Sequence, residues 1–474
     1  ATPRVLVLGA GMTCGPLVEY LGRGGARRVT VVSSVPGQVR YYFRCRADSP
    51  CRGRRLRLLH SCDLCLSLLA ATVAEHDVVV SMLPAPMHPA IAALSVARGK
   101  DMVTASYVGP EMRALHDAAV AAGVRLVNEV GLDPGMDHMA VMRVVDGIAR
   151  RGGRVTALTS VCGGLPAPES ADNPLLYKFS WSPAGVLRAA ANPATFLRDG
   201  RVVSVPGDAL LAAAEPADHP WGALNLEQLP NRDSLAYADL YGVAGTAETV
   251  FRGTLRYAGW SDIMLGLRSL GLYSEEATTA AAVAAAAADG AGGGAGGWGD
   301  RQTWAAVFRG LAASRGFDAA DPTPFLAAKG VREPERVVTA LRWLRVAADD
   351  ADAALAEGET VGEAMCGLLQ QRCAMAPGDR DLVLMHHSVR ASFPGGGADE
   401  THLSSLMLRG GVNFTAMSRT VGITVAVAAE LVLEGEVAAT GVMTPVAATL
   451  YEPALRRLDA EGIRFTEKVI RHRK

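Results

Sequence analysis

The first third of the chain alternates short apolar runs with stretches of helical periodicity. Residues 5–8 form an apolar run typical of a buried strand, and residues 29–32 form a second run that is rich in β-branched side chains. Residues 78–82, 102–106 and 124–130 continue the series, with helical spacing of apolar residues in the intervals. This alternation predicts an α/β fold with a Rossmann-like, doubly wound parallel sheet.

The pattern changes after about residue 137. Pro, Asn and Gly become frequent, and strands such as 154–162 occur without regular helices between them, which predicts a second, α+β domain. Helical spacing returns from 301 to 376 and predicts a helical third domain. Residues 277–299 are almost wholly Ala and Gly, which indicates a flexible insertion. A further amphipathic helix is expected around residues 421–433.

Composition narrows the class of protein. The chain has 474 residues, of which 49% are hydrophobic and 20% are charged, as in a globular protein with a large core. The 47 basic and 48 acidic residues nearly cancel, which argues against nucleic acid and anionic membranes as partners. We find no run of eighteen strongly apolar residues, so no membrane span is expected.

The cysteines are sparse, and the chain opens on a strand rather than on a secretory signal. Both features indicate reducing conditions, and we expect a cytoplasmic location, with the mitochondrion as the alternative. Cys62 and Cys65 form a lone CxxC motif near His60, and Cys45 and Cys51 are the only nearby cysteines that could complete a zinc site. We favour free thiols in an irregular, Arg-rich segment and expect no metal.

A glycine turn follows the first predicted strand and opens a helix. Gly9 and Gly11 are placed as in dinucleotide-binding turns, where glycines let the backbone approach a pyrophosphate at a helix N-terminus. The third glycine of that pattern is replaced by Cys14, and a plain tight turn is the alternative. The second strand ends in Ser33 and Ser34, with neither an acid for the NAD ribose nor an Arg fork, so NAD and NADP both stay open.

Polar turn motifs follow other predicted strands. Asp133 lies in one of them, at an edge where ligands of open α/β sheets bind, and could orient an amine or accept its proton. Arg232 and Arg256 carry forks suited to carboxylates, although each taken alone could form a surface salt bridge.

Together these motifs resemble the glutamate-forming saccharopine dehydrogenases, especially the dehydrogenase half of the bifunctional lysine-ketoglutarate reductase/saccharopine dehydrogenases. The resemblance runs almost from end to end. It rests on VTASY at 103–107, GLDPGMDH at 131–138, CGGLPAPE at 162–169, NPLLYKFSWS at 173–182, PNRDS at 230–234, RGTLRY at 252–257, FTAMS at 414–418 and VG at 421–422.

The resemblance implies a domain organisation. Residues 1–135 would form the Rossmann dinucleotide-binding domain and residues 415–474 would complete it. Residues 136–258 and 379–414 would form the domain that carries substrate and the homodimer sheet. Residues 259–378 would form the helical domain with the Ala/Gly-rich insertion.

The resemblance also implies an activity. Saccharopine, NAD(P)⁺ and water would give L-glutamate and 2-aminoadipate 6-semialdehyde in lysine metabolism. We expect NAD rather than NADP, because the degradative bifunctional form is the nearest resemblance and no Arg fork follows Val32. We also expect a homodimer, with a lysine-ketoglutarate reductase as a candidate fusion partner.

Site residues are carried over on the matching motifs. Substrate contacts are expected from Ser106, Tyr107, Asp133, Arg232, Thr254, Leu255 and Arg256. Cofactor contacts are expected from Gly9, Gly11, Met12, Leu132, Asp133 and Pro134. The candidates for handling the amine proton or the hydrolytic water are Tyr107, Asp133 and Cys162.

One segment departs from the family pattern. Residues 36–69 are rich in Arg and Cys where the family has a regular helix and a third strand, which leaves the adenosine contacts open. Two other functions are therefore kept. A related reductase that forms a polyamine precursor would need fewer carboxylate clamps, so the paired arginines argue against it. A non-catalytic binding dimer with a decayed cofactor site is opposed by the retained substrate motifs.

Overall fold

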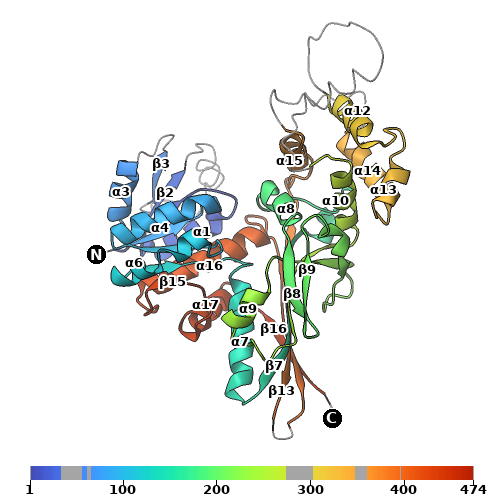
Figure 1. The fold of residues 1–474 in the computed structure, drawn as a ribbon. Helices are drawn as coiled ribbons and strands as arrows, with labels where there is room; N and C mark the ends of the chain where they lie inside the picture. The colour runs from blue at the N-terminus through green and yellow to red at the C-terminus, as the bar shows by residue number, and fades with distance from the viewer. Residues whose placement is uncertain are drawn as a thin grey trace.

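The computed structural model describes residues 2–33, 56–60, 66–273, 303–346, 360–394 and 397–472 (Figure 1). The Ala/Gly-rich stretch 277–299 and the CxxC cysteines Cys62 and Cys65 lie outside the described residues. Two sheets dominate the architecture, with the parallel sheet on the left of Figure 1 and the longer strands of the second sheet on the right.

The first sheet has seven parallel strands, and it is the doubly wound sheet that the sequence predicts. Val7 pairs with Val31 on one side and with Val80 on the other, so the central strands are apolar runs buried on both faces. In spatial order the strands are β15 (Gly441–Met443), β6 (Arg125–Val127), β5 (Asp101–Thr104), β4 (Val78–Ser81), β1 (Arg4–Leu8), β2 (Arg28–Ser33) and β3 (Leu56–His60).

Helices cover this sheet and join it to the rest of the molecule. From the N-terminal part come α1 (Cys14–Gly22), α3 (Leu66–Ala74), α4 (His88–Ala97), α5 (Pro110–Arg113) and α6 (His116–Ala121). From the end of the chain come α16 (Ala416–Leu433) and α17 (Ala448–Ala460).

The second sheet has nine strands and is mixed. Its strands pair antiparallel except β12 and β7, which run parallel to each other. The main path is β10 (Glu215–Pro216), β11 (Leu226–Pro230), β12 (Thr249–Tyr257), β7 (Arg154–Pro166), β13 (Asp381–Ser392), β14 (Glu400–Arg409) and β16 (Thr466–Arg471). The hairpin β8 (Ala194–Arg198) and β9 (Arg201–Val205) joins through β12.

Helices pack on the second sheet as well. The 15-residue helix α7 (Met136–Arg150) contacts β7, β13 and α17, and the sequence predicts no regular helix there. Its buried apolar residues Met139, Met142, Val145 and Ile148 recur at helical spacing, so the sequence does carry the helical period. Two short helices, α8 (Pro183–Ala189) and α9 (Leu235–Leu240), lie on the same part of the chain.

The helices expected as a third domain gather at the upper end of the second sheet in Figure 1. They are α10 (Trp260–Ser269), α12 (Trp304–Arg315), α13 (Thr323–Ala328), α14 (Pro334–Leu344) and α15 (Val361–Arg372). Trp304 and Leu341 belong to the same apolar cluster as Leu255 and Leu384 of the sheet. The helices and one face of the second sheet therefore share one core.

The end of the chain is divided between the two sheets. β15 adds to the first sheet beside β6, as the expected return of residues 415–474 requires. The last strand, β16, instead pairs with β14, where Thr401 faces Ile470. The expectation that all of 415–474 completes the first domain is therefore wrong for β16, because the open edge of β14 supplies its backbone partners.

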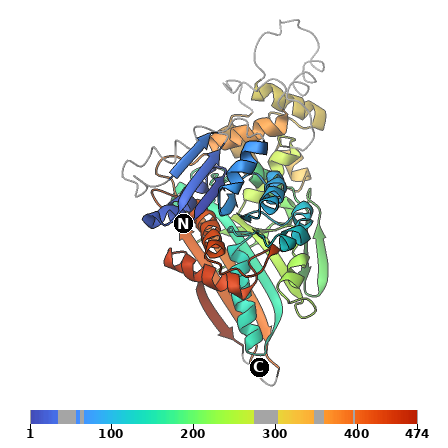
Figure 2. The same cartoon turned by 90° about the vertical axis from the view of Figure 1, so that its left-hand side faces the viewer.

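α16 is the helix on which the two halves meet. Figures 1 and 2 show α16 and α17 in orange and red at the junction of the two sheets, and α16 contacts α1, β4, β5 and β13. In the described part of the chain it is the one helix long and apolar enough to cross a membrane, but 78% of it is buried inside the molecule. A Cβ at Gly422 would lie 2.4 Å from the carbonyl oxygen of Thr13, so only glycine allows this approach to α1.

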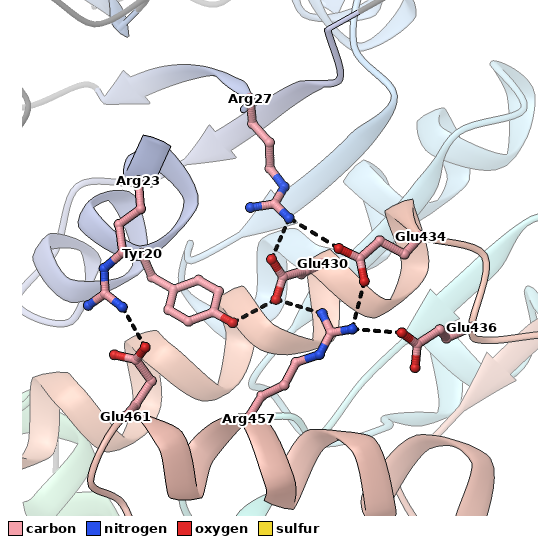
Figure 3. A network of polar contacts seen from close by, with 8 residues as sticks. All are labelled: Tyr20, Arg23, Arg27, Glu430, Glu434, Glu436, Arg457 and Glu461. Atoms are coloured by element: carbon pink, nitrogen blue, oxygen red, sulfur yellow. Dashed lines mark hydrogen bonds and ion pairs between the residues drawn. The ribbon is translucent and has the colours of Figure 1, made fainter. Parts of the chain in front are cut away.

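A network of ion pairs fastens the same junction (Figure 3). Glu430 of α16 accepts a hydrogen bond from the Tyr20 hydroxyl at 2.6 Å and pairs with Arg27 and with Arg457 of α17, the latter at 2.6 Å. Arg457 also reaches Glu434 at 2.6 Å. Burial alone would raise the pKa of Glu430, but the Tyr20 hydrogen bond and the two arginines outweigh burial and lower it.

We expect Glu430→Gln to lower the free energy of unfolding by about 2 kcal/mol at pH 7, because the change leaves partly buried arginines without their shared carboxylate. Glu434→Gln is the matched control: its side chain is 41% exposed against 13% for Glu430, so its loss should be smaller. Urea unfolding of both variants measures the difference.

The same pair of variants tests the pH dependence. Because the folded-state pKa of Glu430 lies below its ordinary value of 4.5, its contribution is present above that value and is lost as pH falls through the folded pKa. The deficit of Glu430→Gln should therefore shrink in acid. Equal losses for the two variants at every pH would contradict the central role of Glu430.

Candidate active site

The glycine turn after β1 has the geometry that close approach of a ligand requires. Gly9 has φ +97°, and a Cβ there would lie 2.8 Å from the Met82 carbonyl oxygen, so no other residue fits. A Cβ at Gly11 would meet nothing within 4 Å, so this backbone is open. Met12 beside it is 48% exposed. α1 starts without a side-chain cap or an acid in its first turn, which leaves its N-terminus free to face an anion.

Cys14 stands where the third glycine of the dinucleotide-binding pattern would be. Its side chain is buried in the core, and burial raises the pKa of the thiol to about 12. Gly422 on α16 lets a second helix approach the start of α1 closely. The residues of the turn therefore fit a dinucleotide pyrophosphate despite the missing glycine.

A tight turn between β6 and α7 carries Asp133. A Cβ at Gly135 would lie 2.3 Å from the backbone of Gly131, and a Cβ at Gly131 would lie 2.9 Å from the Cβ of Ala105. Both glycines are therefore required for the turn to close on β5. Leu132 is buried in the core, Pro134 is buried too, and Asp133 is the residue of the turn that stays partly exposed.

Asp133 is held by an arginine from the second sheet. The Arg252 Nη2 atom lies 2.5 Å from Asp133 Oδ1 and 2.6 Å from Asp137 Oδ2. Arg252 is 1% exposed, and its guanidinium carbon lies 4.1 Å from the Tyr237 ring centre. A buried guanidinium thus joins β12 to the turn.

The pKa values of Asp133 and Asp137 are shifted in opposite directions. Burial raises the pKa of Asp133. The positive charge of Arg252 opposes this rise, and the negative charge of Asp137 adds to it. Burial alone would also raise the pKa of Asp137, but His138, Arg252 and the Gly135 N–H outweigh burial and hold the pKa at about 2. Asp137 is therefore a fixed anion, whereas Asp133 is the carboxylate poised to take up a proton.

Tyr107 and Arg232 lie beside Asp133. The Tyr107 hydroxyl donates to Asp133 Oδ1 at 3.4 Å, and the Arg232 guanidinium carbon lies 5.0 Å from the Tyr107 ring centre. Burial and the Asp133 charge keep the pKa of Tyr107 well above its ordinary value, so the phenol stays protonated. Ser106 lies next to this group in the loop after β5, where its hydroxyl bonds to His88 at 2.8 Å.

Cys162 and Thr254 occupy neighbouring positions on β7 and β12, where they face each other in the register. Burial, followed by the charges of Asp133 and Asp137, raises the pKa of Cys162 well above its ordinary value. The side chain of Leu255 is fully buried against Gly163, so only its backbone is available to the site.

Arg256 lies two residues beyond Thr254, on the same face of β12. It is 3% exposed, and its guanidinium carbon lies 4.9 Å from the Trp260 ring centre and 5.3 Å from that of Tyr177. One nitrogen donates to the Leu255 carbonyl at 2.8 Å, while Nε has no partner. Across the described residues no carboxylate forms an ion pair with Arg256. The buried Glu227 stands opposite it on β11, but its oxygens accept the Gly259 and Ser261 N–H groups.

The structure thus brings Tyr107, Asp133 and Arg232 into one group, with Arg256 apart from it on β12, beside the rings of Tyr177 and Trp260. Arg252 and Asp137 are the residues whose part in the site the sequence analysis missed. The alternation of β12 carries a signal, because a period of two places Arg252, Thr254 and Arg256 on one face. The partner of Arg252 lies 119 positions away and leaves no local trace.

A second buried network supports the same loop, and the sequence analysis did not anticipate it. Glu129 has φ +58° and accepts the Val108 N–H at 2.9 Å, while its other oxygen bonds His138 at 2.8 Å. His138 in turn bonds the Tyr241 hydroxyl at 2.7 Å. No group of three or more potential metal ligands occurs among the described residues.

The architecture and this site define a two-sheet protein of the Rossmann dinucleotide-binding class. Two family models match the chain: the saccharopine dehydrogenase NADP binding domain over residues 5–127 and the saccharopine dehydrogenase C-terminal domain over residues 131–463. The chain belongs to the saccharopine dehydrogenase family.

Individual relatives agree with this assignment. The mitochondrial alpha-aminoadipic semialdehyde synthase of Bos taurus is 35% identical over 98% of this chain, and the chain spans 47% of that relative. The saccharopine dehydrogenase [NADP(+), L-glutamate-forming] of Pyricularia oryzae is 32% identical over 99% of this chain and 100% of the relative. The apo saccharopine dehydrogenase (L-Glu forming) from Saccharomyces cerevisiae superimposes with a TM-score of 0.83 at 30% identity, covering 99% of this chain and 100% of that one.

Because the pKa shifts of Asp133 and Asp137 are opposite, we expect Asp→Asn substitutions at the two positions to have opposite effects on stability. Asp133→Asn should keep or raise the melting temperature at pH 7, because a carboxylate with a raised pKa is less favourable when ionised in the fold, and Arg252 keeps Asp137 as its partner. Asp137→Asn should lose about 2–4 kcal/mol, because its depressed pKa marks an anion that the fold stabilises.

The stability loss of Asp137→Asn should depend on pH. The deficit of Asp137→Asn should be full above the ordinary Asp value of 3.8 and should shrink as pH falls toward about 2, where Asp137 itself is protonated. Calorimetry of both variants measures this. A larger loss for Asp133→Asn than for Asp137→Asn would contradict the proposed division between the two carboxylates.

Proposed function

We propose that the chain is an NAD(P)-dependent oxidoreductase that converts saccharopine and water to L-glutamate and 2-aminoadipate 6-semialdehyde. The observation that carries the proposal is Arg256, a buried guanidinium with no carboxylate partner in the described part of the chain. A buried guanidinium that no carboxylate contacts directly is suited to bind a ligand carboxylate. Family membership supports the same substrate.

The turn at Gly9 and Gly11 and the free N-terminus of α1 would hold the cofactor, with Met12 and the 132–134 turn beside it. When bound, the dinucleotide accepts a hydride from the carbon next to the secondary amine of saccharopine. Water then splits the resulting carbon–nitrogen double bond into the aldehyde and the amino group of glutamate.

Asp133 is our candidate for the group that takes the amine proton. Of the three candidates Tyr107, Asp133 and Cys162, only Asp133 is ordinarily a base at neutral pH. The Tyr107 hydroxyl donates a hydrogen bond to it. The raised pKa values of Tyr107 and Cys162 keep both side chains protonated. Tyr107 can therefore act as a hydrogen-bond donor, and Cys162 can line the site as a neutral thiol. A base held by a buried ion pair keeps its orientation toward the substrate.

The arginines would divide the substrate carboxylates between them. Arg256 offers a buried fork beside Trp260, and Arg232 offers an exposed fork above Tyr107. Planar guanidinium groups bind carboxylates through two parallel hydrogen bonds, which fixes the direction as well as the charge. Ser106 and Thr254 would contact the substrate through their hydroxyl groups.

We propose NADP as the preferred cofactor, in place of the NAD that the sequence favoured. The family model and the fungal relatives carry NADP in their names. The end of β2 also lacks an acid: Ser33 stands there, so no carboxylate repels a 2′-phosphate at that position.

Assembly and location stay proposals. We propose a homodimer through the edge of the second sheet, where Met407, Val469 and Ile470 of β14 and β16 are exposed. The compartment, cytoplasm or mitochondrion, is a prediction; the bovine relative carries "mitochondrial" in its name. Fusion to a lysine-ketoglutarate reductase is also a prediction. The chain spans about half the length of the mammalian relatives, which is consistent with it.

The activity is tested by adding saccharopine to the purified chain with NADP⁺ or NAD⁺ and following absorbance at 340 nm. We expect turnover with saccharopine, a higher kcat/KM with NADP⁺, and no turnover when saccharopine is omitted. The control is a spermidine-type substrate that lacks the three carboxylates. A folded protein that reduces neither cofactor would refute the activity, and a higher kcat/KM with NAD⁺ would refute the cofactor preference.

The role of Arg256 is tested by Arg256→Met and Arg256→Lys. Losing a buried, charged hydrogen bond costs about 2–5 kcal/mol, so Arg256→Met should lower kcat/KM for saccharopine about 30- to several-thousand-fold. Arg256→Lys keeps the charge but not the fork and should recover only part of the activity.

Two measurements separate this role from a structural one. The melting temperature of unliganded Arg256→Met should fall only slightly, because the variant loses one backbone hydrogen bond and the two aromatic contacts but no ion pair, and NADPH binding should be unchanged. Arg198→Ala removes a surface arginine paired with Glu215 and serves as the control for kinetics. If Arg256→Met lost cofactor binding and stability together, Arg256 would not belong to the substrate site.

A further inference from the structure

His88 lies beneath the candidate active site with both ring nitrogens in hydrogen bonds. Nδ1 is 2.9 Å from the Ser81 hydroxyl, and Nε2 is 2.8 Å from the Ser106 hydroxyl and 3.3 Å from that of Thr104. The side chain is 3% exposed and starts α4. The hydroxyls come from the carboxyl ends of β4 and β5 and from the loop that follows β5.

This position is at the ligand edge of the first sheet. Ser81 pairs in register with Leu8, the residue before Gly9, and with Thr104. Ser106 is next to Tyr107, whose hydroxyl reaches Asp133. The imidazole therefore sits between the glycine turn and the loop that faces Asp133.

The backbone of Ser106 is fixed without His88. Its N–H donates to Thr104 Oγ1 at 3.3 Å, and its carbonyl accepts the Glu129 N–H at 3.1 Å. The hydroxyl of Ser106 has His88 as its closest partner. Removing the imidazole would thus leave Ser106 in place and free only the rotation of its hydroxyl.

We propose that His88 is a positioning residue, which holds the Ser106 hydroxyl in the one rotamer that presents it to the substrate. The role rests on the proposed function, because it gives Ser106 a substrate to meet. The hydrogen-bond chain runs from the Ser81 O–H to Nδ1 and from Nε2–H to Ser106 Oγ. Ser106 then keeps its own proton to donate to a carboxylate of the substrate.

The surroundings support a neutral imidazole in this chain. Burial lowers the pKa of His88 to about 4, so the ring carries one proton at neutral pH and can accept at one nitrogen while it donates at the other. A doubly protonated ring would donate to Ser81 and Ser106 together and would leave no acceptor for the Ser81 proton.

Two substitutions separate the two ring nitrogens. A glutamine amide reaches about as far as Nε2, whereas an asparagine amide reaches only about as far as Nδ1. We expect His88→Gln to stay within about threefold of the wild type in kcat/KM for saccharopine. His88→Asn should lose roughly tenfold, with the same division between KM and kcat as Ser106→Ala, because both remove one oriented hydrogen bond.

The decisive measurement is the double variant. If His88 acts through Ser106, His88→Asn in the Ser106→Ala background should cost less than about twofold further, while NADPH binding stays unchanged. His76 is the matched control: it is also buried with both ring nitrogens bonded, to the Thr72 carbonyl and the Thr30 hydroxyl. His76→Asn should lower the melting temperature and leave kcat/KM unchanged.

The outcomes are distinct. An active wild type with additive losses in the double variant overturns the role of His88 and leaves the proposed function intact. The role is also overturned if His88→Gln is as impaired as His88→Asn. An inactive wild type overturns the proposed function, and this role with it.

Discussion

The structure depends on one buried guanidinium. Arg252 comes from β12 in the second sheet and is shared between Asp133 and Asp137, which belong to the turn and helix that follow the first sheet. The two carboxylates stabilise this buried charge, so the position of the turn depends on the strand across from it. The glycines at 131 and 135 let the turn close tightly in that position. Asp133 is held in place because both sheets contribute to its surroundings.

The sequence predicted what local patterns encode. The buried strands of the first sheet are apolar runs, the glycine turn opens α1, and α16 shows helical spacing, so each could be recognised without its neighbours. α7 was missed although its buried residues recur at helical spacing, because the proline- and glycine-rich turn before it is typical of irregular structure. β16 was misplaced because an exposed six-residue strand carries no burial pattern that would name its partner.

The site shows the same division between local and distant information. Asp133, Arg232 and Arg256 lie in motifs that can be read directly, whereas the ion pair of Arg252 with Asp133 spans 119 positions. The face that Leu255 presents to the core is set by the close approach of Gly163 on the neighbouring strand. The protonation of Tyr107 and Cys162 follows from burial, which composition and spacing do not encode.

The return of the chain at α16 and β15 has a consequence for dissecting the molecule. The first family model ends at residue 127, but a fragment cut there would expose the edge of β6 and the apolar side of α1 that Gly422 lets α16 cover. The linear boundary is therefore not a physical one. An isolated nucleotide-binding module would need residues 415–462 joined to it, either as a second polypeptide or by circular permutation.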